Sequence, residues 1–345
     1  MRSILLTGGA GFLGSLLKDR LLKDGMTVVS IDLEEDRTDH LNLTVIRGDI
    51  RSRDLMQSLC REHHFDAIIH CAAILAHAVK DTKFLWDSNV EGTRVVADVA
   101  EEFKISKVIF TSSNCLWGEN FGRPVREDDQ PKPVEIYGLS KWEGEKILLE
   151  RSGKFDAVIF RCPTIIDSGR LGLLSILFEF IDEGRKVWVV GRGRNVYQFI
   201  YAQDLIDAII RALDFKGTEV FNIGSDDVKS FKEVYQLVID KAGTGARVAN
   251  FPRSIAIPLM KLAYALKLSP LGPYQYKMIA EDFVFDTQKI KQKLGWQPTL
   301  KNEDMLLKAY EYYHRNRGEI HGRTNASAHR QAAKMGVIRL LKYFS

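Results

Sequence analysis

Tyr137 and Lys141 are the two residues whose types and spacing best suit proton transfer. Four positions apart on a helix, their side chains lie on one face, a single turn from each other. A free tyrosine titrates near ~10 and is a poor base at neutral pH, but a neighbouring ammonium group favours its phenolate form. Tyr137 can then take the proton of a substrate hydroxyl while a hydride leaves the same carbon. A surface helix with an aromatic–cation contact is the alternative interpretation.

A glycine-rich segment near the N-terminus has the spacing of a dinucleotide-binding turn. Gly8, Gly11 and Gly14 lie between an apolar run at 3–7, typical of a buried strand, and apolar residues at helical spacing from 12 to 21. The first glycine allows the tight turn, the second lets the backbone approach a pyrophosphate, and the third allows close helix–strand packing. The helix N-terminus supplies N–H groups for the phosphates. A glycine-rich turn that binds no ligand is the alternative.

Asp32 completes this motif. It follows the predicted strand 27–31, where an acid about 20 residues beyond the glycines accepts hydrogen bonds from the adenosine ribose. Because a carboxylate there would repel a 2′-phosphate, we expect NAD rather than NADP. Arg37 could reach such a phosphate, so NADP remains an alternative.

Three hydroxyl residues, Thr111, Ser112 and Ser113, follow another apolar run at 107–110 that predicts a buried strand. Side chains at the carboxyl end of a parallel strand face the ligand crevice. We therefore expect one hydroxyl to hydrogen-bond the substrate oxygen beside Tyr137. The alternative is that they only satisfy backbone groups where the strand ends.

In these motifs the chain resembles the extended short-chain dehydrogenase/reductases, specifically the NAD-dependent epimerase/dehydratase family. The similarity extends over roughly residues 1–315 and includes the glycine segment at 7–14, the strand end at 110–118 and the Y-x-x-x-K pair Tyr137 and Lys141. Other similar segments are Asp49-Ile50-Arg51, His70-Cys71-Ala72-Ala73, Asn89-Val90-Glu91-Gly92-Thr93, residues 191–205, Phe221-Asn222-Ile223-Gly224 and Leu294-Gly295-Trp296-Gln297-Pro298.

The resemblance implies roles for individual residues. Tyr137 would be the acid/base, Lys141 would lower its pKa and hold the nicotinamide ribose, and Ser113 would hydrogen-bond the substrate oxygen. The implied cofactor-binding residues are Gly8, Gly11, Phe12, Leu13, Gly14, Asp32, Asp49, Ile50, Ala72, Ala73, Asn89, Tyr137, Lys141 and Pro163. The implied substrate-binding residues are Ser113, Asn114, Thr164, Arg192, Arg194 and Tyr197, with no metal ligand among them.

The resemblance also implies a nucleotide-sugar substrate, transiently oxidised to a keto-sugar by bound NAD. An epimerase then returns the hydride to the other face of the ketone, whereas a dehydratase needs a further acid and base. Family dehydratases often carry carboxylates just after the catalytic hydroxyl, where this chain has Asn114 and Cys115. We therefore expect an epimerase, with a ketoreductase or dehydrogenase, or a dehydratase, as alternatives. A non-catalytic dinucleotide-binding scaffold ranks last, because Tyr137 and Lys141 are both present.

Two positions depart from the family pattern. Thr164 and Tyr197 stand where many sugar epimerases have an asparagine and a diphosphate-binding arginine. Arg192 and Arg194 lie close by and could contact the phosphates instead, or they could belong to a solvated loop. This leaves room for a sterol-like or lipid-linked alcohol as the substrate.

The bulk composition is that of an ordinary globular enzyme. The chain has 345 residues, a formal net charge of +4 and four cysteines without a C-x-x-C pair, so we expect neither disulfides nor a zinc site. It starts directly into the first predicted strand and has no apolar run of 18 residues, so we expect no signal peptide or membrane span and a cytoplasmic location. His77 could overhang the substrate, although an exposed loop histidine is the simpler interpretation.

Alternating strand and helix patterns predict an α/β fold with a Rossmann-type doubly wound parallel sheet and a smaller, mostly helical C-terminal substrate domain. The predicted dinucleotide-binding domain covers residues 1–166, and 201–222 return to it. Residues 167–200 and 223–315 form the predicted substrate domain. A helix is predicted over 169–183, and the cleft between the two domains is the default active site.

The last segment, 316–345, reads as a basic amphipathic tail. Residues 315–345 contain seven Lys/Arg and one Glu, a net charge of +6, which leaves 4 − 6 = −2 for the remainder. Val337, Ile338, Leu341 and Phe344 share one helical face, so the tail could lie peripherally on an anionic membrane. Docking on its own body or on a dimer partner is the favoured alternative, and the resemblance implies a homodimer. Nucleic-acid binding is not expected, because the body is slightly acidic and lacks a recognition motif.

Overall fold

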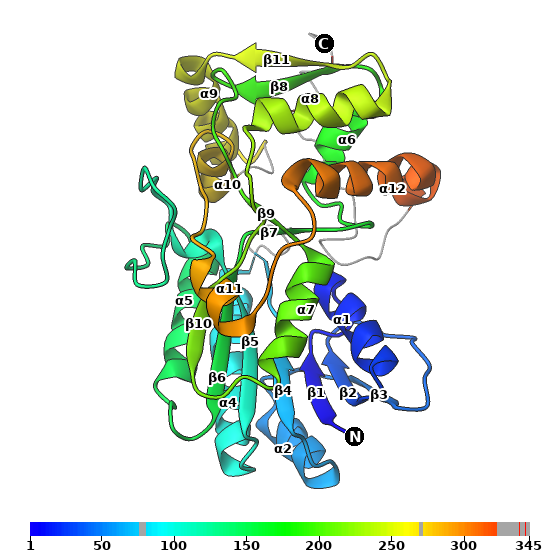
Figure 1. Cartoon of the computed structure of the whole chain (residues 1–345), viewed down its shortest axis with the longest axis vertical. Coiled ribbons are helices and arrows are strands. Elements are labelled where there is room, and N and C mark those ends of the chain that lie inside the picture. Colours follow the sequence, from blue (N-terminus) through cyan, green and yellow to red (C-terminus); the bar gives the residue numbers. More distant parts are fainter. Residues whose placement is uncertain (76–80, 269–271, 323–337, 339–341, 343–345) are drawn as a thin grey trace.

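The computed structural model describes residues 1–75, 81–268, 272–322, 338 and 342. In this part of the chain, a seven-stranded parallel sheet forms the lower half of the molecule in Figure 1, with strand order β10-β6-β5-β4-β1-β2-β3. Its strands are β1 Ser3–Thr7, β2 Thr27–Asp32, β3 Leu43–Arg47, β4 Ala67–His70, β5 Lys107–Ser113, β6 Asp156–Cys162 and β10 Glu219–Asn222.

Helices cover both faces of this sheet, as the apolar runs of its strands require. Ile4 and Leu6 of β1 pack into one core with α1 (Phe12–Lys23) and α7 (Ala202–Ala212), whereas Leu5 packs into the other core. That second core is formed with α2 (Arg53–Glu62), α4 (Gly92–Glu102) and α5 (Ile136–Leu149). The shorter elements on this half are α3 Thr82–Trp86, η1 Asp87–Glu91, η2 Asn114–Leu116 and α11 Gln288–Leu294.

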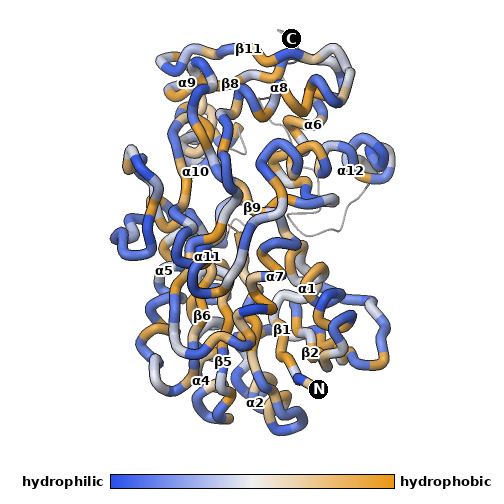
Figure 2. Tube along the Cα trace, in the orientation of Figure 1, coloured by the Kyte–Doolittle hydropathy of each residue, from blue (hydrophilic) through white to orange (hydrophobic). Residues whose placement is uncertain are grey.

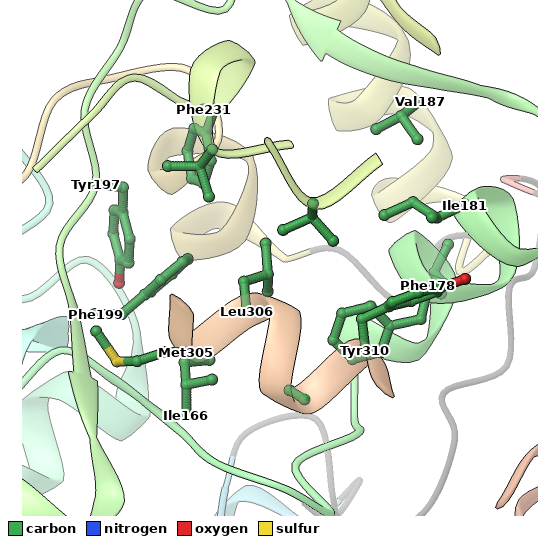
Figure 3. Close-up of a cluster of buried hydrophobic side chains, with 14 of the residues drawn as sticks. Ile166, Phe178, Ile181, Val187, Tyr197, Phe199, Phe231, Met305, Leu306 and Tyr310 are labelled. Atoms are coloured by element: carbon green, nitrogen blue, oxygen red, sulfur yellow. The ribbon is translucent and has the colours of Figure 1, made fainter. Parts of the chain in front are cut away.

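The upper half of the molecule in Figure 1 has its own core. It contains the parallel pair β8 (Lys186–Val190) and β11 (Arg247–Phe251), with α6 (Leu174–Asp182), α8 (Phe231–Ala242) and α12 (Asn302–Gly322). Figure 3 shows Phe178, Tyr197, Phe231, Leu306 and Tyr310 together in this core. The short parallel pair β7 (Thr164–Ile166) and β9 (Phe199–Tyr201) lies between the two halves.

Two further helices, α9 (Arg253–Ala265) and α10 (Pro273–Met278), extend along the edge of the upper half. Figure 2 shows that α9 consists mostly of hydrophobic residues, although several of them are exposed. Among the described residues, no helix combines the length and apolarity needed to cross a bilayer.

The predicted α/β fold with a doubly wound parallel sheet and a smaller, mostly helical second region is confirmed. The segment 202–222 returns to the sheet, because α7 packs against α1 and β10 pairs with β6. The helix predicted over 169–183 is shorter, spanning Leu174–Asp182, because 167–173 form an irregular connection.

The C-terminal tail is described only in part. Residues 316–322 form the last turns of α12, and Val337, Leu341 and Phe344 lie outside the described residues. Ile338 packs against the upper core, and Lys342 forms ion pairs with Glu179 and Glu183. These contacts dock this end of the chain on its own body.

Candidate functional site

The glycine turn connects β1 to α1 at the carboxyl edge of the sheet. Gly8 has a φ of +79°, and a Cβ atom at this position would lie 2.6 Å from the Ala72 nitrogen. A Cβ on Gly14 would lie 2.0 Å from the Gly8 carbonyl oxygen, and one on Gly11 3.2 Å from the same atom. No side chain caps the start of α1, which begins with Phe12 and Leu13. The turn therefore has the close backbone approach and the helix N-terminus that a pyrophosphate site needs.

Asp32 lies beside this turn. Its carboxylate accepts hydrogen bonds from the backbone N–H groups of Ala10 and Glu34, both at 3.0 Å. Arg37 is 84% exposed and forms an ion pair with Glu35 at 3.0 Å. The Asp32 carboxylate is thus the charged group next to the turn. Arg37, the candidate for a 2′-phosphate contact, is already paired with Glu35 on the surface.

The loop that follows β2 is held in place by a lysine of α1. Lys18 of α1 is buried, forms an ion pair with Asp36 and donates a hydrogen bond to the Thr38 hydroxyl at 2.8 Å. Charged groups of this kind are rarely buried without a partner. The pair fixes the segment after β2 against α1, and with it the surroundings of Asp32.

Other predicted cofactor residues lie around the same edge, but some of their polar groups are engaged within the protein. Hydrogen bonds from Arg51, including one of 2.6 Å, hold the pKa of Asp49 below its ordinary value. Ile50 is buried beside it. The Asn89 amide accepts a hydrogen bond from the Ile74 nitrogen at 2.7 Å and donates to its carbonyl at 3.0 Å.

These contacts give the Asn89 side chain a structural role. The amide also donates to the Ser140 hydroxyl on α5 at 3.0 Å, so it holds the segment after β4 against the helix that carries Tyr137. That segment includes Ala72, whose backbone nitrogen donates to the Thr7 hydroxyl at 3.3 Å, and Ala73. Asn89 thus positions the wall of the cofactor site. Pro163 is buried between β6 and β7.

A buried histidine links the same strands. His70 at the end of β4 contacts the Thr7 hydroxyl through Nδ1 at 2.7 Å and the Thr93 hydroxyl through Nε2 at 2.9 Å. Burial, together with the nearby Lys141 charge, lowers the pKa of His70 to about 3. The ring is therefore neutral at physiological pH and serves as a structural bridge. Among the described residues, no cluster of His, Cys, Asp and Glu could hold a metal ion.

Tyr137, Lys141 and Ser113 come together in the centre of the site. The Tyr137 and Ser113 side chains interact, and the Ser113 oxygen accepts a hydrogen bond from the Cys115 nitrogen at 3.1 Å. Burial raises the pKa of Tyr137, and the interaction with Ser113 opposes that rise. Burial lowers the pKa of Lys141 to about 8, and its ammonium lies 4.1 Å from the centre of the Phe110 ring. The structure therefore brings the three predicted catalytic residues into one cluster.

Two glycines let α5 approach close enough to form this cluster. A Cβ on Gly138 would lie 2.1 Å from the Cys115 carbonyl oxygen, and one on Gly144 would lie 3.1 Å from the Phe110 ring. One turn after Lys141, Glu145 forms a fully buried ion pair with Arg161 of β6 at 2.7 Å. This pair fixes α5 against the sheet, because a buried charge that loses its partner is strongly destabilising.

A network of hydroxyl groups lies on the substrate side. The Tyr197 hydroxyl accepts a hydrogen bond from the Asn114 amide at 2.6 Å and lies 3.4 Å from the Thr164 hydroxyl. It also lies 3.0 Å from the hydroxyl of Tyr274, which comes from α10 and interacts with the Cys115 thiol. Three predicted substrate residues thus meet, and α10 closes over them. Sequence reasoning missed Tyr274, since nothing local marks a tyrosine so far along the chain.

Arg192 and Arg194 do not join this network. They line a separate open pocket of about 410 Å³ with Ser230, Lys232, Glu233 and Asn250. No residue of that pocket belongs to the cluster around Tyr137. His77, the other residue suggested to overhang the substrate, lies outside the described residues.

Arg170 is a site residue that the sequence did not reveal. Its guanidinium lies 5.8 Å from the centre of the Phe12 ring, and its charge interacts with Tyr137. Burial lowers the pKa of Arg170 to about 10, and its Nε has no hydrogen-bond partner among the described residues. A buried unpaired donor is costly unless a ligand engages it. Arg170 thus offers a free N–H between the glycine turn and Tyr137.

The sequence matches the family model described as the NAD dependent epimerase/dehydratase family over residues 4–224. An uncharacterized protein of Sinorhizobium fredii, y4nG, is 34% identical over 99% of this chain and 86% of its own length. The UDP-glucose 4-epimerase of Mycolicibacterium smegmatis is 27% identical over 91% of this chain and 99% of its own length.

A solved structure with a similar fold is that of the UDP-glucuronic acid 4-epimerase of Bacillus cereus in complex with NAD. It is 25% identical, covers 90% of this chain and 98% of its own, and superimposes with a TM-score of 0.70.

Proposed function

Because the chain belongs to the NAD-dependent epimerase/dehydratase family, we propose that it is a nucleotide-sugar epimerase that acts through transient oxidation of a ring hydroxyl to a ketone. The observation that carries the proposal is the cluster of Ser113, Tyr137 and Lys141 beside the glycine turn. Two of the similar proteins are 4-epimerases of UDP-sugars. A homodimer in the cytoplasm remains a prediction made from the sequence.

The residues around the glycine turn fit NAD. A Cβ on Gly8 or Gly14 would collide with the backbone of Ala72 or Gly8 and push the turn apart, and the Asp32 carboxylate lies beside the turn, where a ribose would be held. Arg170 adds a buried donor that a phosphate or carboxamide oxygen could satisfy. When bound, NAD would supply the hydride acceptor and, in an epimerase, the donor that returns the hydride.

The chain's own groups would move the proton. Tyr137 would accept the proton of the sugar hydroxyl at its phenolic oxygen and return it after the hydride transfer. The Lys141 ammonium and the positive nicotinamide would counter the effect of burial on the pKa of Tyr137. Ser113, which interacts with Tyr137, would hold the same sugar oxygen in place. No further acid or base is needed for epimerisation.

Dehydration would need such a further group, and the residues after Ser113 do not provide one. Asn114 cannot exchange a proton and already donates to Tyr197. Burial raises the pKa of the Cys115 thiol to about 12, so this group is neither a ready base nor a ready acid at neutral pH. These two residues favour epimerisation over dehydration.

A ketoreductase or dehydrogenase acting on a substrate without a diphosphate is the second candidate. The observation in its favour is the Tyr197 hydroxyl, which is bonded to Asn114 and Tyr274 in place of a cation. Arg192 and Arg194, the nearest arginines along the chain, line a different pocket. Cofactor use separates the candidates, because an epimerase regenerates its NAD and a reductase consumes one cofactor per turnover.

We expect the purified protein to convert UDP-glucose or a related UDP-sugar into its epimer without added cofactor. Proton NMR of the sugar measures the conversion, and denaturation followed by mass spectrometry identifies the released dinucleotide. About one NAD per chain and no accumulation of NADH support the epimerase. An empty protein that oxidises or reduces substrate only with added cofactor supports the second candidate. Released NADP would contradict the role assigned to Asp32.

Replacing Arg170 with glutamine is expected to weaken NAD binding by roughly 10–100-fold, because one charge-assisted hydrogen bond is lost. Calorimetric titration of cofactor-free protein with NAD measures the change. Arg192→Gln is the matched control, since this exposed arginine lines the outer pocket. Equal affinities for NAD in the two variants would show that Arg170 does not contact the cofactor.

A further inference from the structure

Helix α9 presents apolar side chains to solvent. Among the described residues, six of the twelve exposed large apolar side chains fall between Ile255 and Leu268. Ile255, Leu259, Leu262 and Leu266 are each 53–58% exposed. Their spacing of four, three and four residues places them on one face of the helix. A contiguous exposed apolar face of this kind marks an interaction surface, unlike single exposed apolar residues.

The charges around this face are basic. Residues 253–268 contain Arg253, Lys261 and Lys267 and no acidic residue. The loop that carries Arg192 and Arg194 lies against the start of α9, where the Gly191 nitrogen donates to the Phe251 carbonyl at 2.7 Å.

The pocket lined by Arg192, Arg194 and Lys232 also includes Asn250 of β11, three residues before the start of α9. Within the part of the chain that the structure describes, none of these three has an ion-pair partner. The nearby acids are engaged elsewhere: Glu233 caps α8 through Ser230, and Glu281 pairs with Arg253 at 3.3 Å.

We infer that α9 is an interfacial helix that lies on an anionic lipid bilayer, with Arg192, Arg194 and Lys232 against the phosphate headgroups. Its 13 residues span about 20 Å, which is too short to cross a hydrocarbon core of about 30 Å. Apolar side chains on one face with lysine and arginine around them are the pattern of helices that lie in the membrane surface.

The charge pattern favours a bilayer over a second copy of this chain. A two-fold interface places the same patch on both subunits. Two copies joined through α9 would bring their basic pockets near one another, each with three cations and only Glu233 as an acid, and like charges repel. An anionic lipid surface instead satisfies the apolar face and the unpaired cations together.

The test is co-sedimentation of the full chain with vesicles of phosphatidylcholine alone and of phosphatidylcholine with about one-third phosphatidylglycerol. We expect at least tenfold stronger binding to the anionic vesicles, weakened by added salt because surface charges are screened. The double variant Leu259→Glu, Leu262→Glu should lose this binding. Leu237→Glu, on the exposed surface of α8, is the matched control and should bind as the unaltered protein does.

Cofactor content and thermal unfolding show whether each variant is folded. Equal binding to both kinds of vesicle, or to neither, overturns the inference. Binding that survives Leu259→Glu, Leu262→Glu also overturns it and assigns the membrane contact to another segment, such as the basic C-terminus. A dimer that the double variant converts to a monomer, without vesicle binding by either, assigns the face to a second copy. None of these outcomes depends on the proposed epimerase activity.

Discussion

Replacing Tyr137 with phenylalanine is expected to lower turnover by roughly 10²–10⁴-fold and to leave NAD bound. The substitution removes only the phenolic oxygen, which interacts with Ser113. The glycine turn and Asp32, which we expect to hold the dinucleotide, are untouched. Turnover of the UDP-sugar and the amount of NAD released on denaturation are the two measurements.

This variant is informative because we expect turnover to fall while the amount of bound NAD stays the same. A matched control is Tyr264→Phe, which removes a phenolic oxygen from the 46% exposed Tyr264 side chain on α9 and should change neither quantity. If Tyr137→Phe also empties the cofactor site, the hydroxyl holds the dinucleotide and the acid/base assignment is wrong. Unchanged turnover would contradict it too.

Replacing Lys141 with methionine is expected to cost at least roughly 10²-fold in turnover and yet to stabilise the cofactor-free fold at pH 7. Turnover falls because no ammonium remains to favour the Tyr137 phenolate. Stability rises because Lys141 is 3% exposed, and burial lowers its pKa from 10.5 to about 8. Below pH 8 the folded chain thus carries a buried charge that methionine does not.

The stability gain should depend on pH. Between about pH 8 and 10.5 the unfolded lysine binds a proton that the folded one has released, so the stability of the unaltered protein rises with pH across this window. The advantage of Lys141→Met should therefore be on the order of 3 kcal/mol at pH 7 and shrink toward zero above pH 10.5. Thermal unfolding of both cofactor-free proteins at pH 7 and pH 10 measures it. A variant that is less stable at pH 7 would show that the ammonium is stabilised by its surroundings.

The parts of the site that depend on neighbouring residues were predictable from the sequence. Gly14 is required by the Gly8 carbonyl within the same turn, and Gly8 by its φ of +79°, so their spacing alone identifies the motif. Tyr137 and Lys141 lie one helical turn apart wherever the helix packs, and Ser113 follows a strand whose carboxyl end must face the crevice. In each case short-range geometry decides the position.

Residues whose positions depend on long-range packing were not predictable. Tyr274 reaches the site only because α10 folds back over η2, and Arg170 lies in an irregular stretch without any period. The strand β11 was not predicted, because its buried and exposed residues alternate only weakly in a sheet of two strands. Asn89 shows the converse, since the family resemblance implied cofactor binding whereas its amide is bonded to Ile74 and Ser140.

The pairing of β10 with β6 bears on how this chain is made and how it can evolve. Phe221 of β10 is fully buried, and its ring lies 6.0 Å from that of Phe160, although an intervening stretch of the other half separates the two strands in the sequence. During synthesis, β6 thus remains an open edge until the ribosome has passed residue 222. A recombination event with a single crossover near residue 166 would unite β6 with a foreign β10. Exchange of the whole upper half between relatives, with β10 kept, would therefore need three crossovers, near residues 166, 201 and 222.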